Sequence, residues 1–262
     1  MITAYHRPQT LDEALEILSR PNTQPLGGGT LLSRPSIDSI EAVDLQSLGL
    51  GTTTRKGNDL ELGATLTLQE FLENKDCPKA LKAALKLEAP LNTRNAGTVA
   101  GTLVAADGRS TFATALLSLD AKITVIGNQP ASPKKNQRKV SKAEGSTVFS
   151  AGEYLLTHPR GLITQISIPL NAKFAFEYVS RTPSDKPIVC AALTQWSSGR
   201  TRLALGGYGK TPMLAMDGTE PEGLNAAARN ACHEAVDEWA SAEYRMDVAA
   251  TLAKRCLDAM AG

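Results

Sequence analysis

The sequence predicts a mixed α+β fold organised in three subdomains. Segments in which apolar residues recur every three or four positions are typical of helices, and segments that alternate with a period of two are typical of strands. The two kinds follow one another irregularly along the 262 residues, with turns rich in glycine between them. Because there is neither a regular βαβ order nor an internal repeat, the pattern indicates an α+β protein.

The first subdomain is expected to cover residues 1–56. Thr10 and Glu13 fit a capping box, which predicts that a helix begins there, and Pro21 ends it. The elements expected after this helix are a short strand at 24–26, a glycine loop at 27–30 and a strand at 42–45.

The second subdomain is expected to cover residues 57–170. A strand at 60–64 opens it, and Thr67 with Glu70 predicts the start of a helix. The later elements are a helix across 78–88, a loop with short turns over 92–108, a helix over 111–119 and strands over 121–126 and 162–168. The polar stretch 128–145 carries several basic residues and is interpreted as either a solvated hairpin tip or a docking patch.

The third subdomain is expected to cover residues 171–262. Its pattern begins with short β segments and ends with two amphipathic helices. The expected elements are strands at 174–178, 188–193, 201–205 and 213–215, then helices around 224–235 and 248–256.

Composition is that of a soluble globular protein, with 42% hydrophobic and 21% charged residues. The formal net charge of +1 lacks the basic excess of proteins that bind nucleic acid or membrane surfaces. No apolar run approaches the roughly 20 residues that span a bilayer, and the first residues do not resemble a signal peptide. We therefore expect a cytoplasmic protein with no membrane span and no nucleic-acid partner.

The cysteines and histidines are scattered and predict no metal site. Cys77, Cys190, Cys232 and Cys256 form no C-x-x-C pair, and free cysteines usually pack as small buried hydrophobes. If the protein handles electrons, its metal centres are expected on other chains.

Two glycine-rich loops are the strongest candidates for chemistry. In the first, Gly27, Gly28 and Gly29 allow the backbone amides to approach an anion closely, and the Thr30 hydroxyl adds a donor. The loop does not match G-x-G-x-x-G, which disfavours a Rossmann dinucleotide site. A plain tight turn is the alternative interpretation of this loop.

The second loop runs from Thr93 to Leu103. Gly97 and Gly101 stand four residues apart with hydroxyl groups at Thr98 and Thr102, so this loop also predicts N–H and O–H donors. Two such loops suit a ligand with two adjacent phosphates, such as FAD. The alternative is that these small residues permit close packing of the backbone.

Both loops resemble those of the flavoprotein subunits of molybdenum hydroxylases, the xanthine dehydrogenase and carbon monoxide dehydrogenase family. The segment 27–32 is similar to the family's A-G-G-T-D-L or G-G-H-S-L-L loop, and 94–103 is similar to R-N-x-(A/G)-T-I-G-G-N-L. Further matching segments are 115–121 (A-L-L-x-L-D-A), 162–169 (L-(L/I)-T-x-I-x-I-P), Arg181 with Asp185, 203–207 and 241–245. The matches occur in order and cover nearly the whole chain.

The resemblance implies an α+β fold in which two subdomains of the PCMH type bind FAD, followed by a three-stranded sheet with a helical bundle. It implies an oxidoreductase subunit that passes electrons from 2Fe–2S clusters on a small partner chain through FAD to an external acceptor. A large partner chain would hold the molybdenum cofactor, and the complex would be a dimer of heterotrimers. The first loop has no histidine, so FAD is expected to bind non-covalently.

Site residues are carried over from the family by position. The implied FAD contacts are Leu26, Gly27, Gly28, Gly29, Thr30, Leu31, Asn95, Gly97, Thr98, Val99, Gly101, Thr102, Thr111, Ile163 and Glu177. The glycine loops would hold the diphosphate, and Ile163 would lie against the isoalloxazine ring.

Four positions depart from the family pattern. Ala100 and Thr102 replace the usual Gly and Asn, and an alanine with positive φ would cost about 1–2 kcal/mol. Thr111 replaces an Asp that commonly bonds the ribityl chain. Glu177 replaces a common Lys, and its negative charge near the flavin would disfavour the anionic reduced form.

Two other functions remain open from the sequence. The departures are compatible with an assembly or structural subunit that keeps the fold without FAD. A stand-alone flavin oxidoreductase is the third hypothesis, although the sequence shows no catalytic triad or paired-carboxylate pattern.

Overall fold

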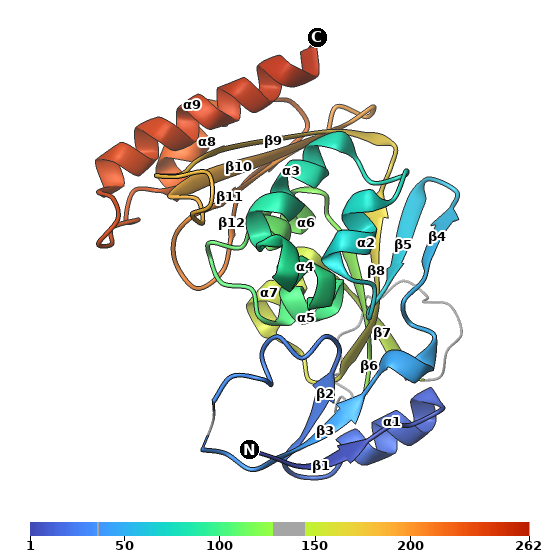
Figure 1. The fold of residues 1–262 in the computed structure, drawn as a ribbon. Helices are drawn as coiled ribbons and strands as arrows, with labels where there is room; N and C mark the ends of the chain where they lie inside the picture. The colour runs from blue at the N-terminus through green and yellow to red at the C-terminus, as the bar shows by residue number, and fades with distance from the viewer. Residues whose placement is uncertain (36, 128–144, 262) are drawn as a thin grey trace.

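The computed structural model describes residues 1–262 except 36, 128–144 and 262. Within the described residues the strands form three sheets, which follow one another from the N-terminal to the C-terminal part of the chain (Figure 1). The mixed α+β class is therefore confirmed. The basic stretch interpreted as a hairpin tip or docking patch lies almost wholly outside the described residues.

The N-terminal sheet is parallel and has the strand order β1-β3-β2. Its elements are β1 (Ile2–His6), α1 (Leu11–Leu18), β2 (Thr23–Leu26), β3 (Ile40–Asp44) and the short helix η1 (Gln46–Leu48). Thr10 caps α1 by accepting a hydrogen bond from the Glu13 amide, which is half of the predicted capping box, while the Glu13 carboxylate accepts from the Gln9 amide instead of that of Thr10. The unit docks on the second sheet through Leu162, which packs with Ala14 and Val43.

The middle sheet has the order β4-β5-β8-β6-β7 and carries a layer of helices on one face (Figure 1). Its strands are β4 (Thr53–Lys56), β5 (Asp59–Gly63), β6 (Lys122–Ile126), β7 (Ser146–Ser150) and β8 (Leu162–Pro169). The helices are α2 (Leu68–Glu73), α3 (Lys79–Glu88), α4 (Leu91–Ala96), α5 (Val99–Val104), α6 (Thr111–Ser118) and α7 (Ala151–Thr157). Because β4 pairs with β5, we place the first subdomain boundary just before Thr53.

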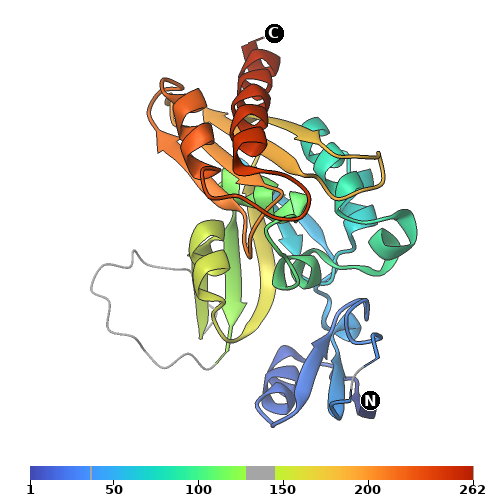
Figure 2. The same ribbon diagram turned by 90° about the vertical axis from the view of Figure 1, so that its left-hand side faces the viewer.

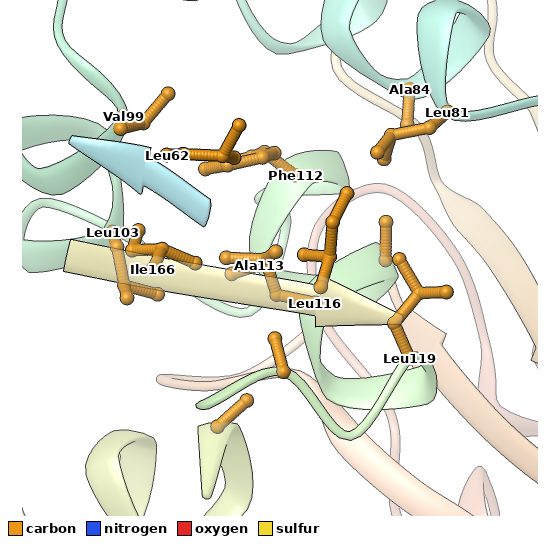
Figure 3. Close-up of a cluster of buried hydrophobic side chains, with 14 of the residues drawn as sticks. Leu62, Leu81, Ala84, Val99, Leu103, Phe112, Ala113, Leu116, Leu119 and Ile166 are labelled. Carbon is orange, nitrogen blue, oxygen red and sulfur yellow. The ribbon is translucent and has the colours of Figure 1, made fainter. Parts of the chain in front are cut away.

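The largest core lies between this sheet and the helices, with α6 at its centre (Figure 3). Every residue of α6 is buried. Phe112 meets Phe71 of α2 edge-on at 6.5 Å between ring centroids, and Leu116 belongs to the same buried cluster as Ile166 of β8. Burying large apolar side chains contributes about 1.5–3 kcal/mol each, so this core dominates the stability of the middle unit.

The C-terminal sheet is antiparallel with the order β12-β11-β10-β9. Its strands are β9 (Ala172–Val179), β10 (Val189–Trp196), β11 (Thr201–Gly206) and β12 (Met213–Gly218), followed by α8 (Leu224–Ala231) and α9 (Ala242–Ala261). Helices α8 and α9 cover one face, and α3 and α6 lie against the other (Figures 1 and 2). The four strand segments and two helices expected from the sequence pattern are confirmed, and the sheet has one strand more than the three that the resemblance implied.

Several elements differ from the sequence-based expectations. The predicted loop over 92–108 holds α4 and α5, because Thr98 caps α5 and residues 97–100 pair with residues 64–68. Strands β1, β4 and β7 and helix α7 were not predicted. The last helix begins at Ala242, earlier than expected, with Ser241 accepting a hydrogen bond from the Tyr244 amide.

Arg245 joins the helical layer to the C-terminal sheet. Its guanidinium group is 1% exposed and donates to the carbonyl oxygens of Ala235 and Ala240 and, at 3.3 Å, of Ile188. It also donates to the Asp237 carboxylate at 2.7 Å. Burial by itself would raise the pKa of Asp237, but the hydrogen bonds from Arg245 and from two backbone amides hold that pKa below its usual value.

Glu88 joins α3 to the N-terminus of α6. One carboxylate oxygen accepts hydrogen bonds from the Phe112 amide at 2.8 Å, the Ser110 hydroxyl at 2.9 Å and the Thr111 hydroxyl at 3.1 Å. Removal from water raises the pKa of Glu88 in spite of these bonds. A carboxylate at a helix N-terminus also interacts favourably with the helix dipole.

We predict that Asp237→Asn lowers the free energy of unfolding at pH 7 by about 3 kcal/mol, because it leaves the charge of Arg245 buried without a counter-ion. The contribution of Asp237 is complete above its ordinary pKa of 3.8 and is lost as pH falls through the lowered folded pKa, so the difference should shrink in acid. Urea denaturation measures both effects. Asp247→Asn, which breaks the exposed pair with Arg229, is the control and should cost less than about 1 kcal/mol. Equal losses in the two variants would contradict the role of Arg245.

We predict that Glu88→Gln gains stability relative to the natural protein as pH rises. The folded pKa of Glu88 is raised, so its stability contribution is complete below the ordinary value of 4.5 and is lost as pH rises through the folded pKa. Each unit of that shift corresponds to about 1.4 kcal/mol. Denaturation curves between pH 4 and 8 should diverge in the variant's favour, whereas the exposed control Glu73→Gln should run parallel to the natural protein. A constant offset for Glu88→Gln would count against the raised pKa.

Candidate cofactor site at the paired glycine loops

The first loop leaves β2 at the carboxyl ends of the parallel strands. This edge of a parallel sheet is where ligands commonly bind. Gly27 to Thr30 are half-buried, and Leu31 is exposed. Gly29 has φ of +71°, a left-handed conformation that favours glycine. The loop therefore turns sharply at the edge of the sheet.

The amide groups of this loop have no acceptor within the described part of the chain. Among the residues that the structure describes, none accepts a hydrogen bond from the N–H groups of Gly27, Gly28, Gly29 or Thr30. The Thr30 hydroxyl likewise has no partner in that part of the chain. Half-buried amides without partners are a common arrangement where an anion binds.

The second loop is built differently. The Gly97 amide donates to the Thr93 carbonyl at 2.6 Å, the Val99 amide to the Leu66 carbonyl at 2.8 Å, and the Gly101 amide to the Thr98 hydroxyl at 3.1 Å. Most backbone donors that the sequence suggested here are thus used inside the protein. Side chains remain: Asn95 is exposed and Thr102 half-buried, and neither has a partner among the described residues.

The two loops lie against each other. A Cβ atom at Gly28 would be 1.5 Å from the Ala96 carbonyl oxygen, so no other residue fits this position without movement of the backbone. A Cβ atom at Gly27 would be 2.9 Å from the Thr98 hydroxyl oxygen. A Cβ atom at Gly97 would lie 4.0 Å from Cγ2 of Thr30. The structure therefore joins the two loops predicted from the sequence into one cradle.

Ala100 causes no strain in this cradle. It lies in the first turn of α5, and its φ is not positive. Its amide donates to the Ala64 carbonyl at 3.3 Å, a bond that alanine forms as well as glycine. The departure from the family pattern at this position costs no backbone energy.

Three of the predicted contacts lie in other elements. Thr111 is fully buried at the start of α6, and its hydroxyl donates to the Ala84 carbonyl at 2.7 Å and contacts Glu88. Ile163 is 4% exposed in β8 opposite Val125. Glu177 lies in β9 of the C-terminal sheet.

Glu177 belongs to the side of β9 that faces α9. Its neighbour Phe176 packs in the core beneath α3 and α6, whereas Ala175 packs in the core beneath α9. Since side chains alternate along a strand, Glu177 shares the face of Ala175. Consistent with this, its charge contributes to raising the pKa of Cys256 on α9, after the larger effect of burial.

A polar cluster beside the first loop was not predicted. The Tyr5 hydroxyl donates to the Asp44 carboxylate, and Arg7 lies 3.7 Å from the same carboxylate. Asp44 is opposite Leu26 in the parallel ladder, so the cluster shares the sheet edge from which the first loop emerges. The alternation Ile2-Thr3-Ala4-Tyr5-His6 is a period-two signal that would have predicted β1, and with it this cluster.

The described residues hold no group of three or more His, Cys, Asp or Glu side chains able to bind a metal ion. None of the helices in the described part of the chain is long and apolar enough to cross a membrane. The donors of the cradle are backbone amides, hydroxyls and one carboxamide, and this donor set fits phosphate oxygens.

Comparison with known proteins identifies the family. Residues 1–171 match the family described as FAD binding domain in molybdopterin dehydrogenase. The uncharacterized protein YgfM of Escherichia coli K12 is 27% identical over 261 residues, covering 96% of this chain and 94% of that protein. The medium chain of glyceraldehyde dehydrogenase from Sulfolobus acidocaldarius is 26% identical over 229 residues, covering 82% of this chain and 78% of that one.

The fold agrees with this relationship. The structure of reconstituted CO dehydrogenase from Oligotropha carboxidovorans contains a chain that superposes with a TM-score of 0.79 at 23% identity, covering 98% of this chain and 96% of that one. The family match extends over both loops of the cradle and over the first two sheets. The chain accordingly belongs to the family of FAD-binding domains in molybdopterin dehydrogenases and is an oxidoreductase subunit of the xanthine dehydrogenase and carbon monoxide dehydrogenase type.

Proposed function

We propose that this chain binds FAD non-covalently in the cradle and serves as the electron-transfer subunit of a molybdenum hydroxylase complex. The observation that carries the proposal is the row of amides from Gly27 to Thr30, which lies beside the side chains of Asn95 and Thr102; none of these groups has a partner among the residues that the structure describes. The family match supports FAD as the ligand.

The chain's own residues would hold the diphosphate without a lysine or arginine. The amides of Gly27 to Thr30 would donate to one phosphate group, and the hydroxyls of Thr30 and Thr102 with the carboxamide of Asn95 would donate to its neighbour. Hydrogen bonds to an ionised acceptor are roughly twice as strong as neutral ones. Bound FAD would supply the redox chemistry, accepting electrons from one partner and passing them to another.

The remaining predicted contacts are of two kinds. Leu26 and Leu31 flank the first loop and would contact the cofactor through aliphatic carbon, whereas Val99 is fully buried in the main core and its role as a contact stays a prediction. The roles of Thr111, Ile163 and Glu177 as flavin contacts stay predictions, and for Thr111 the internal hydrogen bond to Ala84 would have to break first.

The partners are proposed from the relatives. One relative is called the medium chain of glyceraldehyde dehydrogenase, a name that indicates a multi-subunit enzyme for that protein. We infer that this chain assembles with a large subunit carrying the molybdenum cofactor and a small subunit carrying 2Fe–2S clusters, in a cytoplasmic dimer of heterotrimers. The four cysteines are buried and unpaired, so they offer no ligands to a cluster of their own.

We predict that the purified chain takes up one FAD per molecule. Titration with FAD followed by flavin fluorescence and absorbance should give a Kd in the micromolar range or below. Colourless protein that takes up no FAD at high micromolar concentration would overturn the proposal. It would favour a structural subunit, provided that the chain still co-purifies with large and small partners.

We predict that Gly28→Ala weakens FAD binding at least about tenfold, which corresponds to 1.4 kcal/mol. The added methyl group must displace the Ala96 carbonyl and with it the cradle. Gly51→Ala is the matched control, because a Cβ atom there meets the Thr65 hydroxyl at an ordinary 3.5 Å. Circular dichroism should show that both variants fold. Unchanged FAD affinity in a folded Gly28→Ala protein would place the diphosphate elsewhere.

A further inference from the structure

The outer edge of β9 is unusually regular. β9 forms one side of the C-terminal sheet and pairs with β10 over all eight of its residues in unbroken register. Figure 1 shows β9 extended between α9 and α3. An edge strand presents unpaired N–H and C=O groups that another strand can use.

Of the five other edge strands in the described residues, β12, β1, β2 and β4 carry features that discourage such pairing, whereas β7 (Ser146–Ser150) is short but pairs with β6 in unbroken register. β12 and β1 have register irregularities, at Leu203–Ala204 of the partner strand and at Ile2–Ala4 respectively. β2 contains Pro25, which lacks an N–H group. β4 is four residues long and bears Arg55 and Lys56. β9 has one lysine, Lys173, but its Nζ is bound to the Met260 carbonyl of α9.

A cavity of about 910 Å³ runs along this edge. It is lined by the consecutive residues Phe174, Ala175, Phe176 and Glu177 of β9. Consecutive residues of a strand face opposite sides of the sheet, so a cavity that reaches all of them follows the strand's edge. One wall is formed by residues 75–80, which include the turn before α3 and the first residues of that helix. The other wall is formed by the end of α9.

The charge of the groove is positive on the α3 side. The positively charged residues that line it are Arg55, Lys75 and Lys79. The negatively charged ones are Asp76 and Glu177. Asp76 lies 3.9 Å from Arg55 and offsets that charge. No carboxylate in the described part of the chain lies within ion-pair distance of Lys75 or Lys79. Two cations therefore remain available beside the free strand edge.

We propose that the edge of β9 is a docking groove for an extended acidic segment of a partner chain, which adds a strand to the C-terminal sheet. Main-chain hydrogen bonds would supply affinity, and alternate side chains would select the segment. Six residues span about 20 Å, the reach of Ala172 to Glu177. Acidic side chains would lie near Lys75 and Lys79.

Charge disfavours two other occupants. Pairing of β9 with a second copy of itself would bring the same cations of both copies together, which is repulsive. The chain's own stretch 128–145 is basic and has the same sign. The proposal does not depend on FAD, so flavin content measured on the same samples reports separately on the function proposed above.

The test uses a soluble, fluorescein-labelled decapeptide of alternating threonine and glutamate, added to the full-length chain. Hydrogen–deuterium exchange should show new protection in residues 172–179, and fluorescence anisotropy should detect binding below about 1 mM. The same peptide methylated on alternate backbone nitrogens keeps its charge but loses donors along one edge, and it should bind at least about tenfold more weakly. A threonine–lysine peptide should not bind.

Lys75→Glu combined with Lys79→Glu should weaken binding of the acidic peptide roughly tenfold or more by reversing the local charge. The control, Lys210→Glu with Lys254→Glu, changes the net charge equally at exposed positions outside the groove and should leave binding unchanged. The proposal is overturned by the absence of binding, by equal binding of the methylated peptide, or by protection outside β9. Self-association that protects β9 without peptide would also overturn it.

Discussion

The cradle depends on one close approach, the contact between Gly28 and the carbonyl oxygen of Ala96. Because no side chain fits between them, the first loop can lie directly on the second, and its amides are held at the carboxyl edge of the N-terminal sheet. The N-terminal unit also contacts the middle unit through a small apolar cluster around Leu162 and through backbone hydrogen bonds from Gly63 and Thr65 to the residues just before β4. The contact between the two loops thus sets the orientation of the donors, and a single methyl group at Gly28 is enough to disturb it.

Much of the fold could be predicted from the sequence, and the elements that were missed have physical explanations. Capping boxes and apolar periodicity correctly predicted α1, α2, α3 and α6, since these helices are specified by local signals. The stretch 92–108 was expected to be a loop because it is rich in glycine, threonine and asparagine, which have weaker helix preference than alanine. The structure shows two stabilising contacts here: Thr98 caps α5 locally, and the backbone around Thr98 pairs with Leu66 and Leu68, which is a tertiary effect. Ser150 and Glu153 form a capping box, and Ala151, Tyr154 and Leu155 follow at helical spacing, so local signals for α7 were present in the sequence.

The candidate site was likewise predictable from the sequence only in part. Glycine patterns predicted both loops, and the structure brings them together, because close backbone approach requires glycine wherever it occurs. Side-chain positions were less predictable. In β9 a shift of one residue moves a side chain to the opposite face, so transfer by family position did not reveal that Glu177 faces α9. For Thr111, the sequence could not show that a carboxylate from α3, Glu88, occupies the N-terminus of α6 and engages the hydroxyl. The sequence also could not show that the amides of the second loop are satisfied internally.

Helix α6 links the middle and C-terminal units more tightly than a boundary near residue 170 suggests. One side of it fills the main core, while on the other the Ser118 hydroxyl bonds to Thr194 of β10 and contacts the Arg202 carbonyl of β11. Gly108, just before the helix, exchanges backbone hydrogen bonds with Gly207 and Gly209. A chain ending near residue 170 would leave that side of α6 in water. Recombination that swaps C-terminal segments between relatives should therefore succeed only when the donor also contributes a compatible α6, so the two units are expected to evolve as one block.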